Sequence, residues 1–197
     1  GVNRIISGGQ TMNPSTQDFI DAIKKSGAKK AIVLPNNGNI VMAAKQAAEV
    51  SDIPVGIVPT KTISQGLTAM LSFNPDASVD ENVEAMTEDL DTVVSGEVTQ
   101  ATRDTEIDEV EIHKNDYLGI VDGKIKVDNA DLIKTTVDMI EKMLDEDSEI
   151  ITIMFGRDAS EEQAQEVVEQ LEAKHDDLEF EIHDGGQPVY HFLVSVE

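Results

Sequence analysis

Residues 31–63 read AIVLPNNGNIVMAAKQAAEVSDIPVGIVPTKTI, and this stretch decides the fold of the first part of the chain. Ala31–Leu34 and Val55–Val58 are short apolar runs, and each is followed by a polar loop and then by a helical pattern. Asn3–Ile6 opens the same order one step earlier in the chain. Strands that alternate with helices in this way form parallel sheets with right-handed crossovers. The sequence therefore predicts an α/β fold whose first lobe contains a parallel βαβ sheet.

Helix signals in this lobe set its predicted boundary. Helices are predicted to begin near Ser15, Ile40, Thr62 and Ser78. The first and last of them have a capping-box pattern, with Asp18 or Glu81 three residues after the serine. The last helix keeps apolar residues at near-helical spacing as far as Val94, and Gly96 supplies its stop. We therefore predict that this helix links two lobes and that the first lobe comprises residues 1–96.

Residues 97–197 have a different pattern, which predicts a mixed or antiparallel α+β lobe. The predicted strands are Glu97–Arg103, Glu109–Lys114, Tyr117–Val121, Lys124–Val127, Ile150–Phe155, Glu179–Ile182 and Val189–Val196. Asp122-Gly123 is a strong signal for a two-residue hairpin turn. Two amphipathic helices are predicted, over Asp131–Leu144 and Ser160–Lys174.

Composition excludes several classes of function. The formal net charge is -24, so nucleic acid and anionic membranes are poor partners, because both are bound through cationic surface. Acid is dense between Asp76 and Glu111, where Arg103 is the only basic residue; a solvated face is the simpler interpretation, and a docking surface for a basic partner is the alternative. There is no cysteine, and the four histidines are scattered, so no metal site is predicted. The chain opens without Met, signal peptide or membrane span, which predicts a piece of a longer cytoplasmic protein.

Three polar loops are predicted to converge at the carboxyl ends of the parallel strands, where open sheets bind ligands. They cover Ser7–Ser15, Pro35–Asn39 and Pro59–Gly66. Their candidate residues are Gly8, Gly9, Gln10, Thr11, Asn13, Ser15, Asn36, Asn37, Gly38, Asn39, Thr60, Lys61, Thr62 and Ser64. Each loop ends at a helix N-terminus, which favours an anion. These residue types are also ordinary in turns and caps, and that interpretation is the simpler one.

Few residues elsewhere suggest chemistry, and no catalytic set is predicted. His183 is included among the candidate residues but is better explained as a turn or edge residue than as a base. His191 lies within a predicted strand, and the same argument applies to it. Arg157 follows a predicted strand and could meet an anion, although a surface ion pair is the more ordinary role.

Three segments carry a resemblance to a known family: Gly8–Thr16, Leu34–Ile40 and Gly185–Tyr190. Through them the chain resembles the C-terminal region of the kinase subunit of bacterial fatty acid kinase. That family was earlier described as dihydroxyacetone kinase-like or DAK phosphatase-like. The resemblance implies that the phosphoryl-transfer groups, ATP and Mg²⁺ belong to an N-terminal domain outside this chain, and that this domain needs no cofactor. It implies a role in bacterial phospholipid metabolism, and it leaves open that the longer protein is a homodimer.

The chain also looks like a relative of the kinase's fatty acid-binding partner, a DegV-like protein with two α/β lobes. In that family a Thr-Ser-x-Pro-Ser loop and a Ser-rich loop hold the acyl carboxylate. Thr11–Ser15 keeps the Thr and the Pro-Ser frame, Asn36–Asn39 replaces the Ser-rich loop, and Thr60–Leu67 is similar to the partner family's third loop. A DegV-like fold is therefore expected, without certain fatty acid binding.

Three functions follow from these observations. The first is a non-catalytic interaction domain that docks the acyl-carrying partner and brings it to the ATP-binding domain. The second is a small-ligand module, in which the loops hold a fatty acid or another anion. The third, a hydrolase, has little support, because the chain lacks Cys, a His cluster and a G-x-S-x-G nucleophile elbow.

Overall fold

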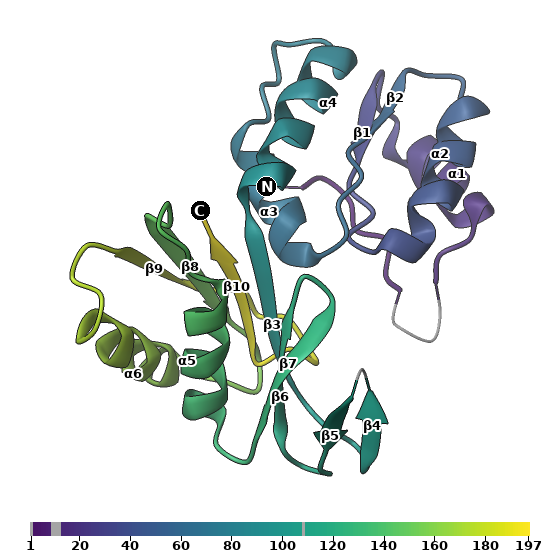
Figure 1. Cartoon of the computed structure of the whole chain (residues 1–197). Helices are drawn as coiled ribbons and strands as arrows, with labels where there is room; N and C mark the ends of the chain where they lie inside the picture. Colours follow the sequence, from purple (N-terminus) through teal and green to yellow (C-terminus); the bar gives the residue numbers. More distant parts are fainter. Residues whose placement is uncertain (1, 9–12, 108) are drawn as a thin grey trace. The chain divides into compact units, whose positions relative to one another are not determined.

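The structure is a computed structural model that describes residues 2–8, 13–107 and 109–197. The chain divides into two compact units, residues 1–92 and 93–197. Figure 1 shows the elements of both units in chain order, coloured from purple to yellow. No helix in the described part of the chain is long and apolar enough to cross a membrane.

The first unit is a parallel α/β layer structure. Its elements are α1 (Thr16–Ser26), β1 (Ala31–Val33), η1 (Gly38–Ile40), α2 (Val41–Glu49), β2 (Val55–Ile57), α3 (Ile63–Leu71), α4 (Val79–Glu88) and η2 (Asp89–Thr92). Strands β1 and β2 pair in parallel, with Val33 opposite Ile57. The parallel βαβ order predicted from residues 31–63 is confirmed.

Helices cover both faces of this small sheet, because successive strand residues point to opposite sides. Val33 and Ile57 pack with Phe19 of α1 and Ala44 and Ala47 of α2. On the other face, apolar residues of the same strands and of α3 and α4 form a second cluster, whose buried members are Val58, Ala69 and Met86. The sheet is therefore sandwiched, and both strands end at one edge that the helices leave open to loops.

Two predictions for the first unit are wrong. Asn3–Ile6 is not a strand: Ile5 is 81% exposed, and the segment is held by Arg4, whose guanidinium donates to the carbonyl of Lys25 at 2.6 Å. The linking helix does not reach Gly96, since α4 ends at Glu88 and Gly96 lies inside a strand of the second unit.

The second unit is built on a six-stranded mixed sheet of order β7-β6-β3-β10-β8-β9. Its elements are β3 (Val94–Gln100), β4 (Thr105–Ile107), β5 (Val110–Ile112), β6 (Tyr117–Val121), β7 (Lys124–Asn129), α5 (Leu132–Met143), β8 (Ile150–Phe155), α6 (Glu161–Glu172), β9 (Glu179–Asp184) and β10 (Phe192–Val196). All neighbours in this sheet are antiparallel except β8 and β9, which are joined through α6. The mixed α+β pattern predicted for this part of the chain is confirmed.

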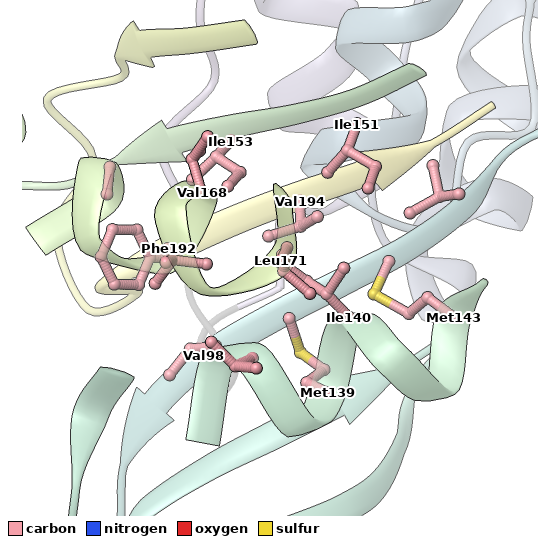
Figure 2. Packing of buried hydrophobic residues seen from close by; sticks show 14 of the residues in the cluster. Val98, Met139, Ile140, Met143, Ile151, Ile153, Val168, Leu171, Phe192 and Val194 are labelled. Atoms are coloured by element: carbon pink, nitrogen blue, oxygen red, sulfur yellow. The ribbon is translucent and has the colours of Figure 1, made fainter. Parts of the chain in front are cut away.

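The main core of this unit lies between the sheet and helices α5 and α6. Figure 2 shows Ile140 and Met143 of α5 and Leu171 of α6 against Ile151 and Val194 of the sheet. Strand β3 fits under α5 only through Gly96, because a Cβ there would lie 2.6 Å from the sulfur of Met143. The glycine that resembled a helix stop is therefore a point of close approach.

Smaller features of the second unit refine the predictions. The Asp122-Gly123 turn is confirmed, with φ of 47° and 84° as a type I′ turn requires. A short strand, β4, was not predicted; it pairs with β5 in a separate two-stranded sheet. Strand β10 begins at Phe192 rather than Val189, because Val189 has a left-handed φ of 72°.

Candidate functional site

Two of the three predicted loops meet at the edge where β1 and β2 end. The backbone N–H of Asn36 donates to the hydroxyl of Thr60 over 2.9 Å, and Thr60 is fully buried. The Asn36 side chain lies against Gly66 of α3, where an added Cβ would clash with its Oδ1 and lie 2.9 Å from its Cγ. At Gly38 a Cβ would be 3.9 Å from Cγ of Lys61. The predicted convergence of these two loops is therefore present in the first unit.

The same loops satisfy part of the helix N-termini with their own side chains. Thr62 caps α3 by accepting from the N–H of Gln65 at 3.1 Å, and the Gln65 side chain accepts from the N–H of Lys61 at 2.8 Å. Asn37 caps η1 by accepting from the N–H of Asn39 at 2.9 Å. Several of the donors that the sequence offered to an anion are thus already used within the chain.

Two buried oxygens at this edge have no hydrogen-bond partner: Asn36 Oδ1 and Ser64 Oγ. A buried polar atom without a partner is costly, so these atoms are the ones that a ligand could satisfy. The groups present are a hydroxyl, an amide and the exposed ammonium of Lys61. They can hold a ligand by hydrogen bonds, and they include no carboxylate or imidazole to move a proton.

The first predicted loop is only partly described, because Gly9, Gln10, Thr11 and Met12 lie outside the described residues. Gly8 and Asn13 are exposed. Ser15 has a structural role, since its side chain accepts from the N–H of Asp18, whose carboxylate accepts the Ser15 N–H at 2.8 Å. These hydrogen bonds lower the pKa of Asp18, which confirms the predicted capping box.

The candidate histidine, His183, belongs to the second unit. It lies on edge strand β9, is exposed, and its Nε2 is 3.2 Å from the carboxylate of Glu181. The prediction of an edge residue is confirmed. His191 is 8% exposed beside Tyr117, and burial lowers its pKa, so its imidazole is neutral near neutral pH.

The loop after β9 is closed by its own glutamine. The amide of Gln187 donates to the carbonyls of Met154 and Tyr190, each at 3.2 Å, and the Arg157 Nε donates to the carbonyl of Gly186 at 3.2 Å. Arg157 therefore serves this loop, and no anion or acidic partner is needed to explain it. The Gly185–Tyr190 segment that carries part of the resemblance has a clear structural role.

Surface hollows lie elsewhere. One of about 420 Å³ is lined by Asp131, Lys134 and Lys174 beside α5 and α6. Another of about 200 Å³ is lined by Ile20, Val50 and other residues of α1 and α2. Neither is lined by the loops that contain Asn36 and Thr60.

One cluster of side chains was missed by the sequence analysis. His113 follows β5, Asp116 precedes β6 and Asp128 lies in β7, and their ligand atoms fall within 4.8 Å of one another. The His-x-x-Asp spacing across a turn was visible in the sequence. The third member was not, because it depends on the pairing of β6 with β7 that sets Tyr117 opposite Asn129.

A comparison with protein families decides the family. The model of the FakA-like C-terminal region, which describes one component of fatty acid kinase, matches residues 1–197. The chain belongs to this family. Its resemblance to the C-terminal region of the kinase component is thereby confirmed.

Curated relatives of this FakA-like domain are longer proteins. An uncharacterized protein of Staphylococcus aureus strain USA300 is 44% identical over 197 residues, which are 100% of this chain and 36% of the relative. A homologue in strain MRSA252 is 43% identical with the same coverage. The domain thus spans about a third of the length of these relatives.

Solved structures similar to this FakA-like domain are DegV-family proteins. A DegV family protein of Corynebacterium glutamicum has a TM-score of 0.62 at 15% identity, covering 93% of this chain and 81% of that one. The fatty acid kinase B3 protein of Streptococcus pneumoniae, solved with linoleic acid, has a TM-score of 0.61 at 14% identity, covering 93% and 76%. The predicted two-lobed DegV-like α/β fold is confirmed.

Proposed function

We propose that this domain docks a fatty acid-binding partner of the DegV-like kind, so that an ATP-binding domain elsewhere in the longer protein phosphorylates the acyl group that the partner carries. In this proposal the domain is not catalytic by itself. ATP and Mg²⁺ bind outside it, and it works in the cytoplasm in bacterial phospholipid metabolism. Catalysis then depends on the proximity that docking provides.

Family and length support the division of labour. The matched family is the C-terminal part of a fatty acid kinase component, and the curated relatives contain nearly two thirds of their length outside the matched region. The described loops offer hydroxyl and amide groups, without a carboxylate pair that would hold a metal and nucleotide. The chemical machinery is therefore expected in the rest of the longer protein.

The contact between Asn36 and Gly66 is the observation that carries the docking proposal. The resemblance assigns the acyl carboxylate of the partner family to these loops. In this chain the Asn36 side chain packs directly on the first turns of α3, and Thr60 and Gln65 are already hydrogen-bonded to the loop backbone. A fold of the acyl-binding kind whose loops are filled by its own side chains favours recognition of another protein over binding of the lipid.

Helix α3 offers a surface for such recognition. Ile63, Leu67 and Leu71 recur every four residues, so they share one face of the helix, and they are 36%, 43% and 79% exposed. Phe73, directly after the helix, is 42% exposed. Exposed apolar side chains gathered on one face are typical of a protein interface. We expect the fatty acid-binding partner to contact this stripe.

The test is a calorimetric titration of the 197-residue chain with a purified DegV-like fatty acid-binding protein from a bacterium that encodes both. Saturable binding at micromolar concentration is expected. Replacing Leu67 and Leu71 by Ser should weaken binding at least about 10-fold, because truncating apolar interface anchors typically costs more than about 1 kcal/mol each. Replacing Met42 and Val50 by Ser is the matched control, since both are about two-thirds exposed on or beside α2.

A small-ligand function is the second candidate, because Asn36 Oδ1 and Ser64 Oγ are buried without partners. Mass spectrometry of lipid extracted from the purified chain separates the two functions. A stoichiometric fatty acid in the extract, together with no partner binding by calorimetry, would replace docking by ligand binding. A chain free of lipid that binds the partner supports docking.

A further inference from the structure

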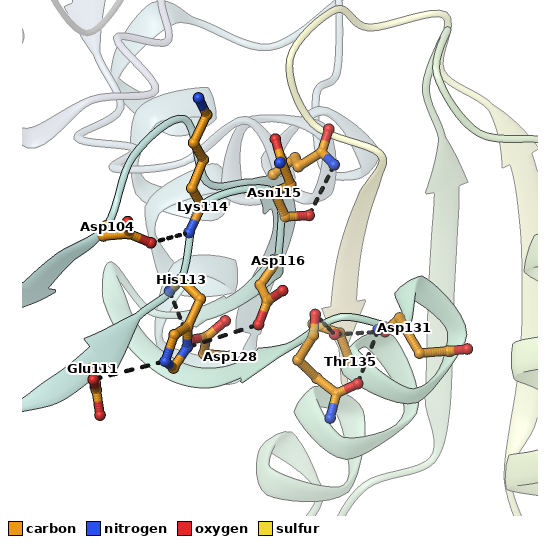
Figure 3. A network of polar contacts seen from close by, with 11 residues as sticks. Asp104, Glu111, His113, Lys114, Asn115, Asp116, Asp128, Asp131 and Thr135 are labelled. Carbon is orange, nitrogen blue, oxygen red and sulfur yellow. Dashed lines mark hydrogen bonds and ion pairs between the residues drawn. The ribbon is translucent and has the colours of Figure 1, made fainter.

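The second unit contains a cluster of metal-ligating side chains that the proposed docking function does not use. Figure 3 shows the imidazole of His113 surrounded by Glu111, Asp116 and Asp128. His113 Nδ1 is 3.0 Å from Asp128 Oδ2 and 3.8 Å from Asp116 Oδ2, and Nε2 is 3.7 Å from Glu111. One ring nitrogen thus faces two carboxylates.

Asp128 gives an independent reason to expect a cation here. Its side chain is only 7% exposed, and its Oδ2 accepts from both the ring and the backbone N–H of His113. Its other oxygen, Oδ1, is buried and has no hydrogen-bond partner. A buried carboxylate oxygen without a donor is costly, and burial of such a charge is ordinarily compensated by a pairing cation or a metal ion.

The surroundings also favour a cation. The carboxylates of Glu111, Asp116 and Asp128 converge on His113, and Figure 3 shows the ammonium of Lys114 pointing away from them. The chain carries a net charge of -24, so the general field attracts positive ions. A single imidazole cannot balance three carboxylates.

We propose that His113, Asp116 and Asp128 bind a divalent transition-metal ion, Mn²⁺ or Zn²⁺. Nitrogen from one imidazole with oxygen from two carboxylates is a ligand set that suits these ions better than Mg²⁺ or Ca²⁺, which prefer oxygen alone. The three ligand atoms lie within 4.8 Å of one another, so small side-chain rotations bring them around one ion. His113 is 58% exposed, which leaves coordination positions for water, and Glu111 orients the imidazole through its other nitrogen.

Such an ion would tie three strands together at one end of the second unit. His113 directly follows β5, Asp116 directly precedes β6, and Asp128 is in β7. Binding to the folded state alone stabilises that state by mass action. A bound ion should therefore raise the unfolding temperature of this unit and slow hydrogen exchange in residues 112–118 and 127–129.

The test is isothermal titration of the metal-free chain with Mn²⁺, Zn²⁺ and Mg²⁺ in separate experiments, with thermal unfolding of the same samples as a second readout. One saturable site per chain is expected for Mn²⁺ or Zn²⁺. The variants His113→Gln and Asp116→Asn should each weaken binding about 10-fold or more, since even residues that only orient a metal ligand are worth about 10-fold to 100-fold in affinity. Asp128 is left unchanged in this test, because it also accepts the backbone N–H of His113 and its loss could disturb the fold.

The matched control is His183→Gln. His183 is exposed to the same degree as His113 and pairs with Glu181 at 3.2 Å, but it belongs to no three-ligand group in the described residues. Its replacement should leave affinity and metal-induced stabilisation unchanged. Three results would each overturn the proposal: no saturable site, equal binding by wild type and His113→Gln, or tighter binding of Mg²⁺ than of Mn²⁺.

Discussion

Gly66 is the residue on which the contact between the two loops depends most directly. Its missing side chain makes room for Asn36, which holds a left-handed φ of 57° and donates its backbone N–H to Thr60. The packing of α3 against the loop after β1 therefore depends on one glycine and one asparagine.

We predict that Gly66→Ala destabilises the first unit by about 1–3 kcal/mol, as overpacking of a close contact does. Urea unfolding followed by circular dichroism measures the change. Gly38→Ala is the matched control, because the nearest atom to its Cβ would be at an ordinary 3.9 Å. The double variant Gly66→Ala with Asn36→Ala should recover part of the loss; no recovery would show that Asn36 is not the obstacle.

Gln187 plays a comparable part in the second unit. Its amide donates to the carbonyls of Met154 and Tyr190, and Gly156 and Gly185 leave room for the loop it closes. A Cβ on Gly156 would lie 2.6 Å from the carbonyl oxygen of Gln187, which is backbone and cannot move aside easily. The Gly-Gly-Gln-Pro motif is thus explained by closure of the chain around its own carbonyls.

Gln187→Ala should lower the stability of the second unit by about 1–3 kcal/mol, because two partly buried carbonyls lose their donor. Thermal and urea unfolding provide the measurement. Gln100→Ala is the comparison variant: its amide also donates to a carbonyl, that of Asn115 at 2.9 Å, but on the exposed surface. Equal effects of the two substitutions would remove the special role of Gln187.

Helix α4 shows how an element is fixed by its first turn. Ser78 accepts from the N–H of Glu81, and the Glu81 carboxylate accepts the N–H of Ser78 at 2.8 Å. These hydrogen bonds lower the pKa of Glu81 below its ordinary value. A carboxyl whose pKa is lowered by folding contributes stability above its unfolded pKa, and that contribution is lost as the pH falls through the folded pKa.

We therefore predict that Glu81→Gln flattens the acid limb of the stability profile of the first unit. Glutamine still accepts the Ser78 N–H, so stability at about pH 7 should change little. Below about pH 4 the wild type should lose more stability than the variant, because only glutamate gains a proton there. Thermal unfolding at a series of pH values tests this, and parallel curves for the two proteins would contradict it.

Elements with strong local signals were predictable, and those set by pairing were not. Capping boxes, the Asp122-Gly123 turn and the runs that form β1 and β2 are local chemistry, so sequence alone placed them. The strand predicted over residues 3–6 had the right residue types but joins no sheet, since most of its side chains stay exposed. Gly96 was misinterpreted because its partners, Met139 and Met143, lie far along the chain.

The candidate site divides along the same line. Loops that follow adjacent parallel strands must meet, so the approach of Asn36 to Thr60 and Gly66 was predictable. His183 was grouped with them through a family resemblance, and it belongs to the second unit, where it pairs with Glu181. The cluster around His113 was missed because antiparallel register, rather than sequence proximity, supplies Asp128.

The molecule as a whole has two cores of unequal size. The second unit has one continuous cluster formed by β3, β8, β10, α5 and α6 (Figure 2), whereas the first has two small clusters on opposite faces of a two-stranded sheet. Hydrophobic stabilisation grows with the apolar area removed from water. The second unit should accordingly be the more stable, and unfolding of the chain should not be two-state.

Hydrogen exchange in increasing urea, read by mass spectrometry, tests this inequality. Amides of β8 and β10 should be the last to exchange, while those of α1 and α2 should exchange at lower urea. Ile153→Ala should cost about 2–5 kcal/mol and shift only the transition of the second unit, and Phe19→Ala should shift only that of the first. Both side chains are almost fully buried, at 0% and 3% exposed, so the two variants are matched. If either substitution moves both transitions equally, the two units unfold as one, and stability would then depend on coupling between them rather than on the size of each core.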